Sequence, residues 1–276
     1  MILQFIISGA LVGFIVGATG VGGGSLMTPL LTLFFGVPAA VAVGTDLLFA
    51  SITKAGGAFS YARKGQIPWP IVLWLALGSV PAALLTLGAL HFAHADPRAL
   101  GAVLKPALGL ALLLTAGAVA FRDQIQALGR RFAASPEASP LAAATVPLAL
   151  GLGEGADAAR QWRTLAVGAC IGTMVSLTSV GAGAIGVVAL FFLYPLLPVR
   201  QLVGADIVHA VPLTLVAGLG HAALGTVDWV MLAGLLLGSL PAIHLGALLA
   251  GRLPERALRL FLACLLLVIG ARLVWV

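Results

Sequence analysis

Residues 17–25 read GATGVGGGS and residues 176–184 read SLTSVGAGA, and this pair of glycine clusters decides how the chain is interpreted. The clusters are two copies of one motif: residues 19–24 align with residues 178–183 at an offset of 159, and downstream the same residues recur at an offset of 160. Matches of Gly, Ala and Val arise easily in this composition, whereas matches of Asp and Trp do not. The recurrences that establish an internal duplication are those of Asp46 as Asp206 and of Trp69 as Trp229.

The composition places both copies in a membrane. Of the 276 residues, 61% are hydrophobic and only 9% are charged, and the mean hydropathy is +1.13. The apolar residues form long runs, each near the ~20 residues that a helix needs to cross a bilayer. A transmembrane β-barrel would have alternating segments of about 10 residues instead. The sequence therefore predicts an all-α, polytopic transmembrane protein.

We predict about ten membrane segments in two inverted repeats of five, each repeat containing a Gly-broken hairpin. The first repeat occupies 1–121, a polar cytoplasmic connector 122–162, and the second repeat 163–276. The predicted segments are 2–17, 25–36, 39–62, 69–90 and 100–121, followed by 163–177, 184–197, 199–222, 228–250 and 256–275. The first of these is interpreted as a retained helix, since no basic region or clear cleavage site marks a signal peptide.

The distribution of basic residues predicts the orientation. Five segments per half is an odd number, so the second half must be inverted relative to the first. Most Arg and Lys residues then fall on one side, which the positive-inside rule assigns to the cytoplasm of a bacterial inner membrane. Both termini are predicted to be periplasmic. The net charge of +6 fits this rule better than it fits a nucleic-acid partner.

The glycine clusters are the first candidate site. Where a chain breaks and restarts as a helix, free N–H groups need partners, and irregular backbone at membrane depth must lie in protein or face a water-filled cavity. Two helix N-termini meeting from opposite sides would bind an anion; close helix packing is the alternative role for such glycines. The candidate substrate-binding residues are Thr19, Gly20, Gly22, Gly23, Gly24 and Ser25, with Thr178, Ser179, Gly181, Ala182 and Gly183 in the second copy.

Ionisable residues inside the predicted spans are the second candidate site. A charge at a helix centre costs at least ~2.5 kcal/mol on insertion scales, so Asp46, Lys54, Asp206 and His209 each suggest a function. Lys54 lies near the predicted midplane, where it suits an anionic substrate or pairs with an aspartate. The aspartates can equally be structural, and His209 can merely orient Asp206 from three residues away. Gly78, within a span away from both clusters, is expected to tolerate alanine.

These stretches resemble the sulfite exporter TauE/SafE family of membrane transporters. The resemblance rests on GATGVGGGSLMTPLL, AVGTDLLFASITKAGGAFSYARKGQI, SLTSVGAGAIG and VGADIVHAVPLTLVAGLGHAALGTVDW. It implies export of a small anion such as sulfite, thiosulfate or a sulfonated organic acid. The signature positions fall on Gly20, Gly22, Gly23, Gly24, Thr45, Asp46, Thr53 and Lys54, and on Thr178, Gly181, Gly183 and Asp206. The repeat mate of Lys54 is Thr214, so the site is expected to be asymmetric.

The leading hypothesis is a secondary transporter that alternates access around a midplane site, with no cofactor, no metal and no enzymatic activity. No phosphate-binding loop of the Gly-rich, Lys-terminated kind is present, which argues against ATP drive. Proton coupling and downhill flux both remain open, as does a homo-oligomer. An anion channel is the main alternative. An intramembrane aspartyl protease using Asp46 and Asp206 is disfavoured, because inversion would separate the two carboxylates along the membrane normal.

Overall fold

The computed structural model describes residues 2–19, 24–63, 65, 67–92, 97–125, 127, 156–249 and 255–275. Within these residues the regular structure is entirely helical, as predicted. The helices of the first half are α1 (Ile2–Thr19), α2 (Gly24–Phe34), α3 (Ala39–Arg63), α4 (Trp69–Phe92) and α5 (Pro97–Ala120). Those of the second half are α8 (Ala156–Thr178), α9 (Ala184–Leu193), α10 (Val199–Ala223), α11 (Trp229–Leu249) and α12 (Glu255–Trp275).

Five helices in the described part of the chain are long and apolar enough to cross a membrane: α3, α4, α5, α10 and α11. Their outer faces carry many exposed large apolar side chains, which a water-soluble domain would bury. Trp69 and Trp229, the repeat mates that begin α4 and α11, are both exposed. Exposed Trp at a helix end is typical of residues that anchor a helix at the lipid–water interface.

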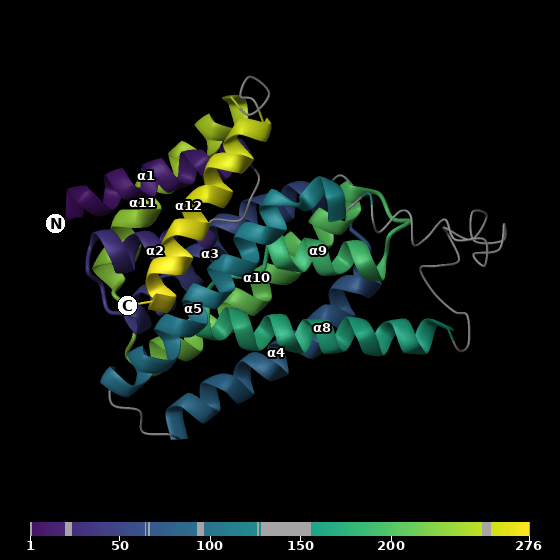
Figure 1. Cartoon of the computed structure of the whole chain (residues 1–276), viewed down its shortest axis with the longest axis horizontal. Coiled ribbons are helices and arrows are strands. Elements are labelled where there is room, and N and C mark those ends of the chain that lie inside the picture. The colour runs from purple at the N-terminus through teal and green to yellow at the C-terminus, as the bar shows by residue number, and fades with distance from the viewer. Residues whose placement is uncertain are drawn as a thin grey trace.

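Helix packing follows the internal duplication. The first helix of each half packs against the fourth helix of the other half, so α1 lies along α11 and α8 lies along α4 (Figure 1). The third helices, α3 and α10, pack against each other, and so do the fifth helices, α5 and α12. Exchanging the two halves therefore turns the α1–α11 pair into the α8–α4 pair, and leaves the α3–α10 and α5–α12 pairs unchanged.

The duplication extends to individual contacts between these helices. A Cβ added at Gly9 of α1 would lie 2.3 Å from the Leu235 carbonyl oxygen of α11. At the equivalent place, a Cβ added at Gly168 of α8 would lie 2.4 Å from the Leu75 carbonyl oxygen of α4. Small residues that let helix backbones approach this closely are a common means of helix association in membranes. The exchanged pairs are thus packed backbone to backbone in both halves.

Gly78 belongs to this packing, and the expectation that it tolerates alanine is wrong. A Cβ at Gly78 would lie 2.1 Å from the Leu165 carbonyl oxygen of α8, and backbone cannot move aside cheaply. We expect Gly78→Ala to lower the free energy of unfolding by about 1–3 kcal/mol through overpacking. Thermal or detergent unfolding of the purified protein measures this. Gly88→Ala in the same helix is the control, because nothing lies within 4 Å of its added Cβ; equal losses in both variants would contradict the interpretation.

The predicted boundaries hold to within a few residues except at α8. This helix begins at Ala156, so the last part of the predicted connector is helical. Its first residues, ADAARQW, contain no helix breaker, and polarity there led the sequence interpretation to assign them to a linker. Residues 128–155 of the connector lie outside the described residues.

Candidate functional site

The buried ionisable residues lie on α3 and α10, the two helices that pack against each other near the centre of the fold. Asp46 and His209 are fully buried, Asp206 is 1% exposed, and Lys54 is 8% exposed. α3 is the most buried of the apolar spans, which accounts for its lower hydropathy: its polar side chains face protein rather than lipid. The fold therefore brings the charged residues of both halves into one region.

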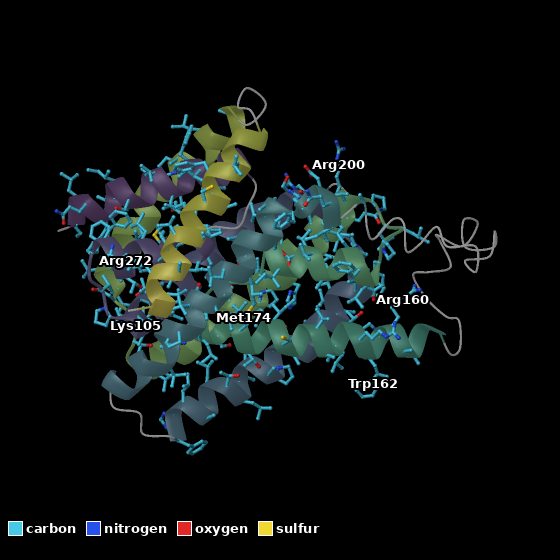
Figure 2. The ribbon with its side chains drawn as sticks, in the orientation of Figure 1. Lys105, Arg160, Trp162, Met174, Arg200 and Arg272 are labelled. Carbon is cyan, nitrogen blue, oxygen red and sulfur yellow. The ribbon has the colours of Figure 1, made fainter. Side chains whose placement is uncertain are left out.

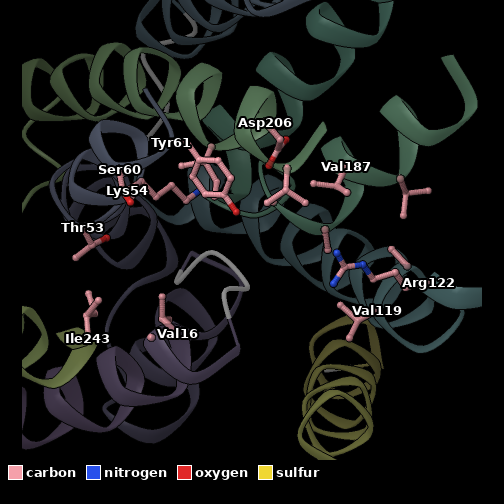
Figure 3. Close-up of a pocket in the computed structure, with 18 residues that line it drawn as sticks. Val16, Thr53, Lys54, Ser60, Tyr61, Val119, Arg122, Val187, Asp206 and Ile243 are labelled. Atoms are coloured by element: carbon pink, nitrogen blue, oxygen red, sulfur yellow. The ribbon is translucent and has the colours of Figure 1, made fainter. Parts of the chain in front are cut away.

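A cavity of about 430 Å³ opens beside these residues. Figure 3 shows Lys54 and Asp206 in its wall together with Arg122, which follows α5. The ends of α1 and α9 and one residue of α11 complete the lining. The lining includes Thr53, Lys54, Ser60, Tyr61, Arg122, Gly183, Val203 and Asp206.

Lys54 links the cavity to the second glycine cluster. Its Nζ donates a hydrogen bond of 2.8 Å to the carbonyl oxygen of Ala182. The carboxylates of Asp206 and Asp46 both lie within electrostatic range of the ammonium group. A buried ammonium group held by one carbonyl retains donors for a further acceptor. The position therefore suits an anion that enters the cavity.

The second glycine cluster has a backbone that requires glycine. Gly181 has φ 125° and Gly183 has φ 141°, and Ser179 also has a positive φ, of 58°. These angles place the start of α9 at the cavity, with Gly183 preceding its first residue. The carbonyls of Gly181 and Gly183 accept from Gly186 and Val187. Within the described ranges, the N–H groups of Gly181, Ala182 and Gly183 are not seen to donate to any acceptor.

The two repeat-related aspartates have different surroundings. The Oδ2 atom of Asp46 accepts from the Thr28 hydroxyl and from the Thr28 N–H at 3.2 Å, so Asp46 is tied to the first turns of α2. The Oδ1 atom of Asp206 is buried and has no hydrogen-bond partner among the described residues. It lies against Gly186 of α9, where an added Cβ would be 1.9 Å from Oδ1. One aspartate is therefore bound to its short helix, and the other retains free acceptor capacity beside Lys54.

The sulfite exporter TauE/SafE family model matches residues 5–273. The chain belongs to the TauE/SafE family. It is 36% identical over 274 residues to the "Probable membrane transporter protein YjnA" of Bacillus subtilis (strain 168), covering 99% of this chain and 100% of that protein. It is 30% identical over 242 residues to "Probable membrane transporter protein YdhB" of the same organism, covering 83% and 82%. No solved structure matches the chain significantly. The chain is thus an integral membrane transporter.

Four of the residues predicted from the TauE/SafE resemblance line the cavity together: Thr53, Lys54, Gly183 and Asp206. Ala182, predicted as an N–H donor, instead supplies the carbonyl that holds Lys54. Asp46 and Ser179 are buried near one another, with the Ser179 side chain approaching the Asp46 carboxylate. Lys54, Ala182, Gly183 and Asp206 therefore form one cluster drawn from both repeats.

Other predicted site residues are not in the cavity wall. The Thr45 hydroxyl accepts from the Asp228 N–H at the start of α11. The Thr178 hydroxyl accepts from the Val180 N–H and so shapes the chain after α8. His209 shares a hydrogen bond of 2.7 Å with the Ser79 hydroxyl of α4, so its recorded partner is Ser79 rather than Asp206. These residues connect helices around the site.

Part of the first glycine cluster lies outside the described residues. Gly20, Gly22 and Gly23 lie outside the described residues, as do the side chains of Thr19 and Ser25. Gly24 is the first residue of α2. Whether the first cluster binds the substrate therefore remains a prediction.

Sequence reasoning missed several residues that line the cavity or fix its carboxylates. Tyr61 follows Lys54 by seven residues, about two turns, which places it on the same face of α3, and that spacing could have identified it. Ser60 lies on a neighbouring face and carried no such signal. Arg122 was counted only as a loop charge. Thr28 carried no sequence signal, because its bond to Asp46 joins residues on different helices.

Proposed function

We propose that this protein is a secondary transporter that exports a small sulfur-containing anion by alternating access around the Lys54 cavity. The observation that carries the proposal is the position of Lys54, a buried ammonium group beside a cavity and beside backbone N–H groups that precede α9. A cation, free N–H donors and the positive end of a helix dipole all favour an anion. No acidic side chain other than Asp206 lines the described cavity wall.

The substrate class comes from the family. Its description names sulfite exporters, and the similar proteins of Bacillus subtilis are named probable membrane transporters. Sulfite, thiosulfate and sulfonated organic acids share a compact anionic group that backbone donors read by charge and shape. We therefore propose an anion of this group as the transported substrate, with related selenium oxyanions of similar size as competitors.

We propose an inverted arrangement of two five-segment repeats, with both termini in the periplasm of an inner membrane. The two halves make equivalent helix pairs and equivalent glycine contacts, which supports two structural repeats. The placement of basic residues is consistent with the predicted sides: Arg160 and Arg200, assigned to the basic-rich cytoplasmic side, lie at one end, and Lys105 and Arg272, assigned to the other side, lie at the opposite end (Figure 2). Both chain termini lie toward the end with Lys105 and Arg272 in the view of Figure 1. Basic residues favour the cytoplasmic side.

Alternating access is supported by a difference between repeat mates. Most residues that line the cavity have repeat mates that are buried in the protein core, where the structure describes the mate's side chain. Val203 lines the cavity, whereas its mate Val43 is 0% exposed. The further buried mates are Thr28, Pro29, Asp46, Leu47, Ala83, Val175, Ser176, Leu213, Thr214, Ala217 and His221. In an inverted repeat the opposite state would open this second set and close the first.

Paired cysteine variants test this exchange. In a background with Cys170→Ala and Cys264→Ala, which removes the two exposed free cysteines, we expect Val203→Cys to react with a membrane-impermeant thiol reagent from the cytoplasmic side. Val43→Cys should react from the periplasmic side, and at least about tenfold faster during anion exchange than without substrate. Labelling rates in right-side-out and inverted vesicles measure both. Labelling of the two variants from the same side would contradict the inverted repeat.

Flux in proteoliposomes tests the function itself. Purified protein is reconstituted and offered sulfite, thiosulfate and a sulfonated acid, with empty liposomes as the control. A carrier gives saturable uptake that is stimulated by the same anion inside the vesicle. Flux that does not saturate and shows no such stimulation would favour an anion channel. Absence of flux for every anion in the panel would overturn the proposal.

A further inference from the structure

We infer that Asp206 is a proton-binding site coupled to the anion, so that the protein moves one proton together with each anion. This inference rests on the proposed anion transport. Three observations point to it: Asp206 and Lys54 line one cavity, both are buried, and Oδ1 of Asp206 lacks a hydrogen-bond partner among the described residues. Oδ1 of Asp46 is likewise without a hydrogen-bond partner among these residues, but Asp46 does not line the described cavity wall, and Thr28 of α2 holds its Oδ2 atom.

Charge balance gives the coupling. In the empty protein, the Asp206 carboxylate compensates the Lys54 ammonium across the cavity. A substrate anion bound to Lys54 would place a second negative charge beside Asp206, and like charges in a poorly solvated site strongly disfavour each other. A proton that enters from the cavity and binds the Asp206 carboxylate removes this conflict. The anion and the proton then leave together, and Asp206 again compensates Lys54 when the protein returns empty.

The charged and titratable neighbours of Asp206 are consistent with this role. From α3 it faces Lys54, whose attraction is shared with Asp46. From its own helix, His209 is directed to Ser79. α9, which packs against α10, has only apolar side chains and glycine. Arg122 and Tyr61 are the remaining titratable groups in the cavity wall. Asp206 is thus the carboxylate beside Lys54, the cation proposed to bind the substrate anion.

Coupling to a single proton distinguishes among anions. A monoanion with one proton crosses without net charge, whereas a dianion such as thiosulfate carries one net negative charge. An inside-negative membrane potential therefore favours outward movement of the dianion. The stoichiometry of one proton follows from the single carboxylate in the described cavity wall and does not depend on which sulfur anion is bound.

The test uses the reconstituted full-length protein, thiosulfate as the probe and a pH-sensitive dye inside the vesicles, with the membrane potential clamped by K⁺ and valinomycin. The wild type should acidify the lumen by one proton per thiosulfate taken up. Asp206→Asn should lose net uptake and proton movement at least about tenfold, because the empty protein would return with Lys54 uncompensated. The same variant should keep thiosulfate exchange, in which the anion stays bound at each return.

Two further variants complete the design. Asp206→Glu retains a carboxylate and should restore net uptake with one proton per anion. This variant keeps the inference testable if the asparagine variant does not fold. Asp228→Asn, an exposed carboxylate that caps α11, should leave coupling unchanged. Net thiosulfate uptake by the wild type without acidification of the lumen would overturn this inference and leave the proposed transport intact. Absence of exchange for thiosulfate, sulfite and isethionate would overturn both.

Discussion

Lys54→Ala is expected to reduce anion transport by about 10- to 100-fold or more, with expression and helical content retained. The ammonium group is the buried cation of the proposed binding site, and a hydrogen bond involving a charged group contributes about 1.5–3 kcal/mol, which is about one to two factors of ten in affinity. Saturable uptake into proteoliposomes measures the effect. The loss is expected chiefly in the concentration that gives half-maximal uptake and in the maximal rate.

Two variants separate a binding role from a structural one. Lys105→Ala removes an exposed lysine of α5 and is expected to leave uptake unchanged. Lys54→Met combined with Asp206→Asn removes both buried charges together, so the fold should be more stable than with Lys54→Met alone. Transport should nevertheless stay absent in the double variant. Unchanged uptake kinetics in Lys54→Ala would assign Lys54 to a purely structural role.

Gly183→Val is expected to abolish anion binding. Gly183 has φ 141° and ψ −93°, a conformation that a β-branched residue adopts only with strain of order 1–3 kcal/mol. Relief of that strain would rotate the backbone just before α9 and redirect the N–H groups that face the cavity. Binding measured by calorimetry with thiosulfate should become undetectable, and uptake should fall at least about tenfold. Gly23→Val, in the first glycine cluster, is expected to act in the same way.

Gly56→Ala is the matched control for the glycine variants. Gly56 is a helical glycine of α3, two residues from Lys54, and nothing lies within 4 Å of its added Cβ. Alanine there should preserve binding and slightly stabilise the helix. If Gly183→Val folds and binds the anion as the wild type does, backbone donors at the second glycine cluster do not form the site.

The sequence predicted the helices well because its strongest signals are periodic and duplicated. Asp46 with Asp206 and Trp69 with Trp229 align the two halves, and both aromatic residues do begin their helices. Even small features repeat: Gly65 and Gly225 both have positive φ, at 62° and 72°, in the turns after α3 and α10. Such local features depend on nearby residues, so a sequence pattern contains them.

Contacts between helices were harder to predict. Gly78 looked like a neutral span position, yet it touches the backbone of α8, a partner that lies far along the chain. The difference between the two aspartates was also missed. It comes from Thr28, whose repeat mate is Val187, so one carboxylate gains two donors and the other does not. Lys54 was identified correctly as a candidate, but its bond to Ala182 required the fold.

The most direct measurement of the central claim is the position of a bound anion. Crystals of the purified protein equilibrated with selenite or selenate provide an anomalous signal that locates the oxyanion by its selenium. We expect the selenium peak inside the cavity, with oxyanion oxygens about 3 Å from Lys54 Nζ and from N–H groups of Gly181, Ala182 or Gly183. A selenium peak at full occupancy elsewhere, with this cavity empty, would contradict the account.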